Sequence, residues 1–233
     1  MKISIFSIPE ISLGKYNIKD TRLDQVDKIS KAKKKTYVQV ELVNEDTILE
    51  ADLILVLKDS RVDMVLKDLE FVETRLSRCE QESEKNLLNK LKGILEKEEF
   101  ILNAQMDDEE KKYILRYGLL TAKRIVLAER KDLDDLDSLL FRVLEESGFI
   151  SFFTTGERET RAWLIKKGTC AYEAAGAIHT DLQKGFIRAE IIGFDDFIQC
   201  GGETQAKQAG KLRLEQKDYV LQDGDLVNIR FNK

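Results

Sequence analysis

Apolar residues near the start of the chain follow strand-like spacing. Residues 2–8 are β-branched and partly alternating, which predicts a strand that ends at Pro9. Residues 37–43 predict another strand, and the nearly continuous apolar run 51–57 is typical of a strand that is buried on both faces. Between these segments, Asp20 fits the cap of a helix with apolar residues three positions apart. The pattern predicts an α/β core.

A long helical region comes next. Between Val65 and Cys79, apolar residues stand alternately four and three positions apart, which is the spacing of a coiled-coil seam. This pattern loses its phase across residues 80–86, and apolar residues resume in a new phase from Leu87. The break predicts two helices packed as a hairpin, although no Gly or Pro marks it. One long helix with a stutter is the alternative.

The remaining pattern divides into helices and strands on either side of residue 150. Before it, residues 107–120 and 134–146 predict helices and residues 124–128 predict a strand. After it, the spacing predicts a small mixed sheet with one helix and glycine-bearing loops. The strands are expected over 161–165, 185–192 and 226–231, and the helix over 172–178.

Composition supports a boundary near residue 150. Nine of the 13 glycines follow this residue, whereas the net charge of −5 arises from the part before it. The single proline excludes proline-rich linkers. Because a net acidic chain is a poor default binder of polyanions, any binding of nucleic acid requires a local basic patch.

Cysteine and histidine content excludes several kinds of site. Three widely spaced cysteines fit neither a disulfide framework nor a zinc site, and the single histidine, His179, excludes a multi-histidine metal site. We therefore expect no bound metal. No apolar run approaches the roughly 20 residues that span a bilayer, and no secretory signal is recognisable at the start. We expect a cytoplasmic protein with no membrane partner.

A series of short motifs in the last third of the chain carries a family resemblance. In this order they resemble the C-terminal TGS domain of the YchF/Obg-like ATPase family, over essentially all of residues 150–233. The resemblance implies a β-grasp, ubiquitin-like fold of the kind found on translation and stringent-response proteins. The motifs are Phe152-Phe153-Thr154-Thr155-Gly156, Arg161-Ala162-Trp163, Ile178-His179-Thr180-Asp181, Lys184-Gly185-Phe186-Ile187-Arg188-Ala189-Glu190, Asp195-Asp196-Phe197, Ala209-Gly210-Lys211, Lys217-Asp218-Tyr219-Val220, Gln222-Asp223-Gly224-Asp225 and Arg230-Phe231-Asn232.

Resemblance to the same family extends toward the N-terminus, with gaps. It implies an α/β fold with a reduced P-loop-GTPase-like core (residues 1–61 and 103–150), a coiled-coil-like helical hairpin insertion (62–102) and the TGS domain (151–233). The segments that carry it are 20–24, 50–56, 62–102 and 113–128.

The segment after the first strand departs from the family's phosphate-binding loop, which reads Gly-x-Pro-Asn-x-Gly-Lys-Ser-Thr. A phosphate cradle needs glycine amides, a lysine and a hydroxyl for Mg²⁺. Here Gly14 and Lys15 are followed by Tyr16 in place of Ser or Thr, and Pro9 stands five positions before Gly14, where glycine is needed. A turn beside a short strand is the simpler interpretation of Gly14 and Lys15.

The family's other nucleotide motifs are also incomplete. The glycine of the second-switch motif Asp-x-x-Gly is absent from residues 42–46, and the base-reading motif Asn-x-x-Glu falls at residues 129–132, where the asparagine is missing. We therefore expect no catalytic residue and no nucleotide cofactor. Pro9, Gly14 and Lys15 are interpreted as remnants of the loop.

Basic residues of the C-terminal part are candidates for binding RNA or a protein partner. Ordinary solvated charges are the alternative, because this part of the chain is neutral overall. His179 also fits a turn or capping role, and Trp163 is expected in the core. Lys31 and Lys33–Lys35 form the densest basic cluster, which a charged helix end would explain. The candidates are His179, Lys184, Arg188, Lys211, Arg213 and Lys217.

The resemblance, together with the incomplete nucleotide motifs, implies a non-catalytic protein that binds RNA, the ribosome or a translation-related partner. In the family, such binding is attributed partly to the TGS domain and to the helical arm. An ATP or GTP hydrolase with a remodelled site is the first alternative. The second is a decoy that pairs with an intact family member through the helical hairpin.

Overall fold

The computed structural model describes residues 1–232 and divides into two compact units. The first unit consists of Met1–Tyr16 and Val40–Leu139, and the second of Asn17–Gln39 and the chain from Leu140 on. Residues 17–39 therefore group with the C-terminal part of the chain, although the sequence suggested that they belong to the N-terminal core. The expected domain division at residue 150 stays a prediction.

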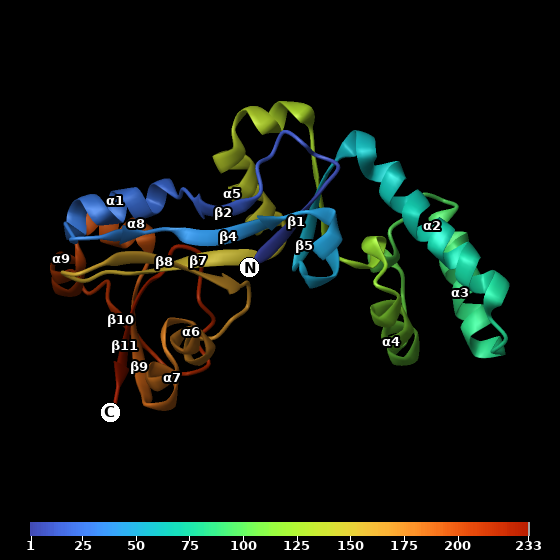
Figure 1. Cartoon of the computed structure of the whole chain (residues 1–233). Coiled ribbons are helices and arrows are strands. Elements are labelled where there is room, and N and C mark those ends of the chain that lie inside the picture. The colour runs from blue at the N-terminus through green and yellow to red at the C-terminus, as the bar shows by residue number, and fades with distance from the viewer. Residues whose placement is uncertain (233) are drawn as a thin grey trace. The chain divides into compact units, whose positions relative to one another are not determined.

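A five-stranded sheet in the order β2-β4-β1-β5-β6 organises the first unit (Figure 1). β1 pairs in parallel with β4 and β5, and β5 pairs in parallel with β6. All residues of β5 are buried, as predicted for a strand covered on both faces. The strands are β1 (Lys2–Phe6), β2 (Gly14–Ile18), β4 (Val38–Val43), β5 (Leu53–Leu57) and β6 (Ile125–Ala128).

The predicted helical hairpin is present as α2 (Arg61–Arg78) and α3 (Glu82–Leu95), which lie side by side (Figure 1). The chain leaves α2 through Cys79, whose backbone is extended, so the helices separate without Gly or Pro. Their apolar stripes pack together and against α4 (Asp108–Tyr117). The prediction of two helices is confirmed, and the alternative of one long helix is wrong.

Short turns connect the other elements of the first unit. The buried carboxylate of Asp68 on α2 accepts hydrogen bonds from the amides of Leu120 (2.9 Å) and Thr121 (2.7 Å), which ties the hairpin to the chain that leads into β6. Among the described residues, no helix is both long and apolar enough to cross a bilayer. The connecting elements are η1 (Glu45–Glu50), η2 (Lys58–Ser60), η3 (Ile101–Asn103), η4 (Leu120–Ala122) and η5 (Arg130–Asp134). The helix α5 (Leu136–Glu146) begins in the first unit and continues into the second.

A mixed six-stranded sheet in the order β10-β9-β11-β7-β8-β3 forms the centre of the second unit. One face buries apolar residues such as Phe152 and Ile191 against α6 (Ala171–Ile178), whose small Ala174 allows close packing. The other elements are α1 (Thr21–Ser30), β3 (Lys35–Thr36), β7 (Phe149–Thr154), β8 (Thr160–Lys166), α7 (Thr180–Lys184), β9 (Phe186–Ile192), β10 (Arg213–Glu215) and β11 (Leu226–Phe231).

Helices α8 (Phe194–Cys200) and α9 (Glu203–Gln208) occupy a segment where the sequence predicted only glycine-bearing loops. The glycines lie at the ends of these helices: Gly193 precedes α8, and Gly201, with φ 80°, ends it directly before Gly202 begins α9. The expectation of a single helix in this part of the chain is therefore wrong.

Candidate functional site

The carboxyl edge of the five-stranded sheet is where its topology favours a ligand site. Because β1, β4, β5 and β6 run in parallel, the segments that follow them share this edge. Open α/β sheets bind ligands outside the carboxyl ends of their strands. The resemblance to the YchF/Obg-like family would place a phosphate-binding loop here, directly after β1.

The loop after β1 is bound by one of the protein's own carboxylates. Ser7 has a left-handed backbone, with φ 53°. Its amide and its hydroxyl donate to Glu45 Oε1, at 2.9 and 3.3 Å. Glu45 Oε2 lies 2.7 Å from the Nζ of Lys67 on α2. Partial burial acts to raise the pKa of Glu45, but the bonds from Lys67 and Ser7 hold it below its usual value. Glu45 is therefore an ionised acceptor at the amide that begins this loop.

The remnants of the phosphate-binding loop do not form a cradle. Gly14 and Lys15 are the first two residues of β2, and no helix begins between β1 and β2 within the described chain. The Tyr16 hydroxyl donates to the Ser12 carbonyl oxygen at 2.7 Å. Pro9 lies in the turn before them and is exposed. The simpler interpretation of Gly14 and Lys15 was a turn beside a short strand, and the structure places both residues in the strand itself, after the turn.

Other cations at this edge also face carboxylates. Glu129 lies 2.5 Å from the Nζ of Lys58 and 2.8 Å from the Nζ of Lys131. These two lysines lower the pKa of Glu129 to about 2. Arg130 lies 3.2 Å from a carboxylate oxygen of Glu10. An incoming phosphate would therefore meet a neighbouring carboxylate at each of these cations. Within residues 1–232, no group of three or more His, Cys, Asp or Glu side chains is placed to hold a metal.

His179 caps a helix in the second unit. Its Nδ1 accepts a hydrogen bond from the amide of Asp181 at 3.1 Å, at the beginning of α7. This arrangement confirms the capping role that the sequence favoured. The ring is otherwise largely exposed, so contact with a partner stays a prediction.

The other basic candidates have separate neighbours. Lys211 pairs with Asp196 at 3.0 Å, Arg213 donates to the Tyr219 hydroxyl at 3.0 Å, and Lys217 lies 5.1 Å from the centre of the Tyr172 ring. Arg188 lies on β9 directly opposite Arg230 of β11, and Lys184 ends α7. The structure thus gives these side chains local roles, and their roles in partner binding stay predictions.

Comparison with known proteins identifies the family. The YchF-GTPase C-terminal family model, described as a protein of unknown function, matches residues 149–232. The "Ribosome-binding ATPase YchF" of Bacillus subtilis is 30% identical over 236 residues, which cover 73% of this chain and 64% of that protein. The chain belongs to the YchF/Obg-like family.

Similarity to YchF proteins is highest over a short stretch. The "Ribosome-binding ATPase YchF" of Haemophilus influenzae is 57% identical over 82 residues, or 35% of this chain and 23% of that protein. The structure of the Schizosaccharomyces pombe YchF GTPase matches 99% of this chain and 97% of its own with a TM-score of 0.76 at 19% identity, which shows a shared fold. The chain spans less than two thirds of the curated YchF relatives it matches.

Sequence reasoning missed the residues that shape the edge of this YchF-like sheet. Glu45 follows β4 and Lys67 lies on the hairpin, 38 and 60 residues from Ser7 along the chain. In the sequence, both are ordinary charged residues among many. The family resemblance in the sequence indicated where a phosphate-binding loop would lie, but only the parallel pairing of β1 with β4 brings Glu45 to this place.

Proposed function

We propose that this chain is a ribosome-binding member of the YchF family that does not hydrolyse nucleotide. The names of its relatives support the ribosome as the partner. The second unit contains the whole stretch 149–232 that matches the YchF-GTPase C-terminal family model. Such a role would place the protein in the cytoplasm.

The bond between Ser7 and Glu45 carries the non-catalytic part of the proposal. A phosphate that approached the Ser7 amide would meet a carboxylate already bound there at 2.9 Å. Two unit charges of the same sign 4 Å apart repel by about 4 kcal/mol at an effective dielectric constant of about 20. Over residues 1–232 no set of glycine amides compensates for this repulsion, because β2 begins where a phosphate-binding helix would be needed. Glu45 therefore disfavours the ligand that hydrolysis requires.

Two measurements on the full chain test the two parts of the proposal separately. The first is co-sedimentation with purified ribosomes at moderate salt, where we expect the chain in the ribosomal pellet. The second is calorimetric titration with ATP and with GTP in the presence of Mg²⁺, where we expect no heat of binding up to about 1 mM ligand, equivalent to about 4 kcal/mol.

Each contrary result would overturn a different part of the proposal. Absence of the chain from the ribosomal pellet would refute the ribosome as partner. Tighter nucleotide binding than about 1 mM would show that a remodelled site persists, and would refute the assignment as non-catalytic. Size-exclusion chromatography with an intact YchF protein tests the decoy alternative: co-elution of the two without ribosomes would support the decoy and count against this proposal.

A further inference from the structure

The edge of the second unit's sheet formed by β3 and β8 is locally basic. The Lys33 amide donates to the Glu157 carbonyl oxygen at 3.2 Å, and the Thr160 amide donates to the Lys34 carbonyl oxygen at 2.9 Å. These bonds bring residues 31–35 beside residues 157–161. Together the two segments contain six basic and two acidic side chains, in a chain whose net charge is −5. This is the local patch that binding of a polyanion requires.

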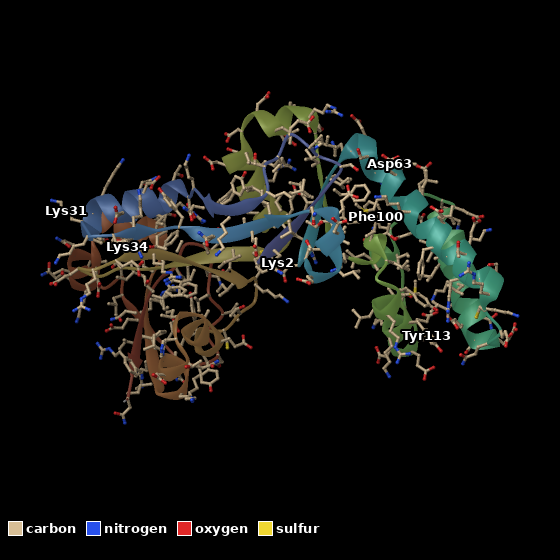
Figure 2. All side chains as sticks on the ribbon, viewed as in Figure 1. Lys2, Lys31, Lys34, Asp63, Phe100 and Tyr113 are labelled. Atoms are coloured by element: carbon tan, nitrogen blue, oxygen red, sulfur yellow. The ribbon has the colours of Figure 1, made fainter. Side chains whose placement is uncertain are left out.

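Several cations of this edge have no carboxylate partner. Lys34 pairs with Glu159 at 3.1 Å, and Lys35 pairs with Asp24 at 2.5 Å. Lys31, Lys33 and Arg158 are exposed, and no ion pair involving them is found in the described part of the chain. Figure 2 shows Lys31 and Lys34 at the same end of the second unit. Three free cations therefore flank the beginning of β3 and β8.

A ladder of flat groups lies along β7 and β8 and includes Arg161, which pairs with Thr36 of β3. Phe152 and Trp163 face each other across β7 and β8, with ring centres 6.4 Å apart and planes inclined by 15°. The guanidinium carbon of Arg161 lies 4.0 Å from the centre of the Trp163 ring. The indole nitrogen of Trp163 donates to Thr154 Oγ1 at 2.9 Å, which fixes the ring. Because Phe152 is fully buried and Arg161 is half-buried, the ladder leads from the core to the surface and ends in a planar cation.

A shallow groove of about 300 Å³ runs beside Arg161 and Trp163. Side-chain amides form part of its wall, with Gln39 Nε2 donating to Asn17 Oδ1 at 3.3 Å. Amide side chains pair with the edges of nucleobases, and guanidinium planes stack on their faces. Cations combined with stacking platforms are typical of surfaces that bind single-stranded nucleic acid.

We propose that the β3–β8 edge binds single-stranded RNA. One base stacks on the guanidinium of Arg161, and the phosphates lie against Lys31, Lys33 and Arg158. The inference rests on the proposed function, because a ribosome offers RNA as the most abundant polyanion on its surface. An acidic protein segment would pair with the cations, but it would offer no planar base to stack on Arg161 and no base edge to pair with the side-chain amides.

The single tryptophan of the chain, Trp163, makes the test direct. Titration of the full chain with an oligouridylate and an oligoadenylate of about ten nucleotides should quench the Trp163 fluorescence to saturation. R161K keeps the charge and removes the plane, so it should weaken binding roughly 5- to 150-fold without changing the salt dependence. The double variant K31Q/K33Q should instead reduce the slope of log K against log salt by about 1.4, or 0.7 for each lost phosphate contact.

Two controls keep the test decisive. K166Q removes an exposed lysine at the far end of β8 and should bind RNA like the parent. Thermal unfolding of R161K should match the parent, which shows that lost binding is not lost folding. The proposal would be overturned if R161K bound RNA with the same affinity as the parent. It would also be overturned if K166Q weakened RNA binding as much as K31Q/K33Q does. Equal quenching by polyglutamate would overturn it in favour of an acidic protein.

Ribosome co-sedimentation of the same proteins separates this inference from the proposed function. If the parent chain pellets with ribosomes but no oligonucleotide quenches Trp163, the RNA edge is refuted and the ribosome remains the partner. If oligonucleotides bind and the chain does not pellet, the ribosome is refuted and the RNA edge stands.

Discussion

Neutralising Glu45 tests whether its charge, and not merely its shape, holds the loop after β1. The variant E45Q keeps an oxygen that can accept from the Ser7 amide, but it leaves Lys67 without its carboxylate. The matched control is D46N. Asp46 is the next residue along the chain, is exposed, and accepts only from the side-chain Nδ2 of Asn44, at 3.0 Å, among the bonds of the described residues.

The magnitude follows from the contacts of Glu45. A hydrogen bond to a charged acceptor contributes about 1.5–3 kcal/mol and a neutral one about 0.5–1.5 kcal/mol, so neutralisation costs about 1 kcal/mol at Ser7. The pair with Lys67 adds no more than about 1 kcal/mol, because the Lys67 side chain is 55% exposed and that of Glu45 is 35% exposed. We expect E45Q to lose about 1–2 kcal/mol of unfolding free energy at neutral pH, and D46N less than about 0.5 kcal/mol.

The pH dependence of the loss has a definite sign. The pKa of Glu45 is lower in the folded protein than its ordinary value of 4.5. Its stabilising effect is therefore present above the unfolded pKa and disappears as the pH falls through the folded pKa. The difference in stability between the parent and E45Q should therefore be larger at pH 7 than at pH 3.

Urea unfolding followed by circular dichroism at the two pH values measures these differences. Equal stability of the parent and E45Q at pH 7, or a larger difference at pH 3 than at pH 7, would refute the role assigned to the charge. Calorimetry on E45Q adds a functional test. We expect still no binding of ATP, because the Ser7 amide alone is no phosphate cradle.

Two further predictions concern the hairpin and the second unit. The largely buried Glu84 accepts from Arg75 Nε and from the Tyr117 hydroxyl, each at 2.7 Å, and these bonds lower its pKa to about 2, so E84Q should cost about 1–2 kcal/mol at pH 7. Because the folded pKa is the lower one, urea unfolding should show this cost shrinking as the pH falls from about 4.5 toward 2. A Cβ on Gly185 would lie 2.0 Å from the carbonyl oxygen of Asn232, so G185A should destabilise by about 1–3 kcal/mol. G93A, in open space on α3, should stabilise by about 1 kcal/mol. Thermal unfolding distinguishes the two variants, and equal shifts in the melting temperature of G185A and G93A would contradict the steric explanation.

The local pattern of apolar and polar residues was sufficient to predict the hairpin and most strands. The phase change after Cys79 located the break between α2 and α3, since each helix must present its apolar stripe to the other. The same reasoning failed for α8 and α9, because helices of seven and six residues show too few turns for a period to emerge. Glycines that cap such helices have the same appearance in a sequence as glycines in loops.

Residues that meet only through sheet pairing were beyond sequence reasoning. β3 has two residues, and only its pairing with β8 brings Lys34 beside Thr160. The missing glycines and hydroxyl of the phosphate-binding loop were visible in the sequence, because that motif is local. The carboxylate of Glu45 at the same place was not, because β1 and β4 are brought together only by folding.

The net charge of −5 does not oppose RNA binding at the β3–β8 edge. At physiological ionic strength the screening length is about 8 Å, so a bound strand responds to the charges around it and not to the total of the chain. Glu157 and Glu159 are the acidic side chains within the two segments of this edge, and Glu159 is already paired with Lys34. The cations at the sheet edge after β1 are in the opposite situation, since each of Lys58, Lys67 and Lys131 faces a carboxylate. A polyanion should therefore bind the second unit with strong salt dependence while the carboxyl edge of the first unit stays closed to phosphate.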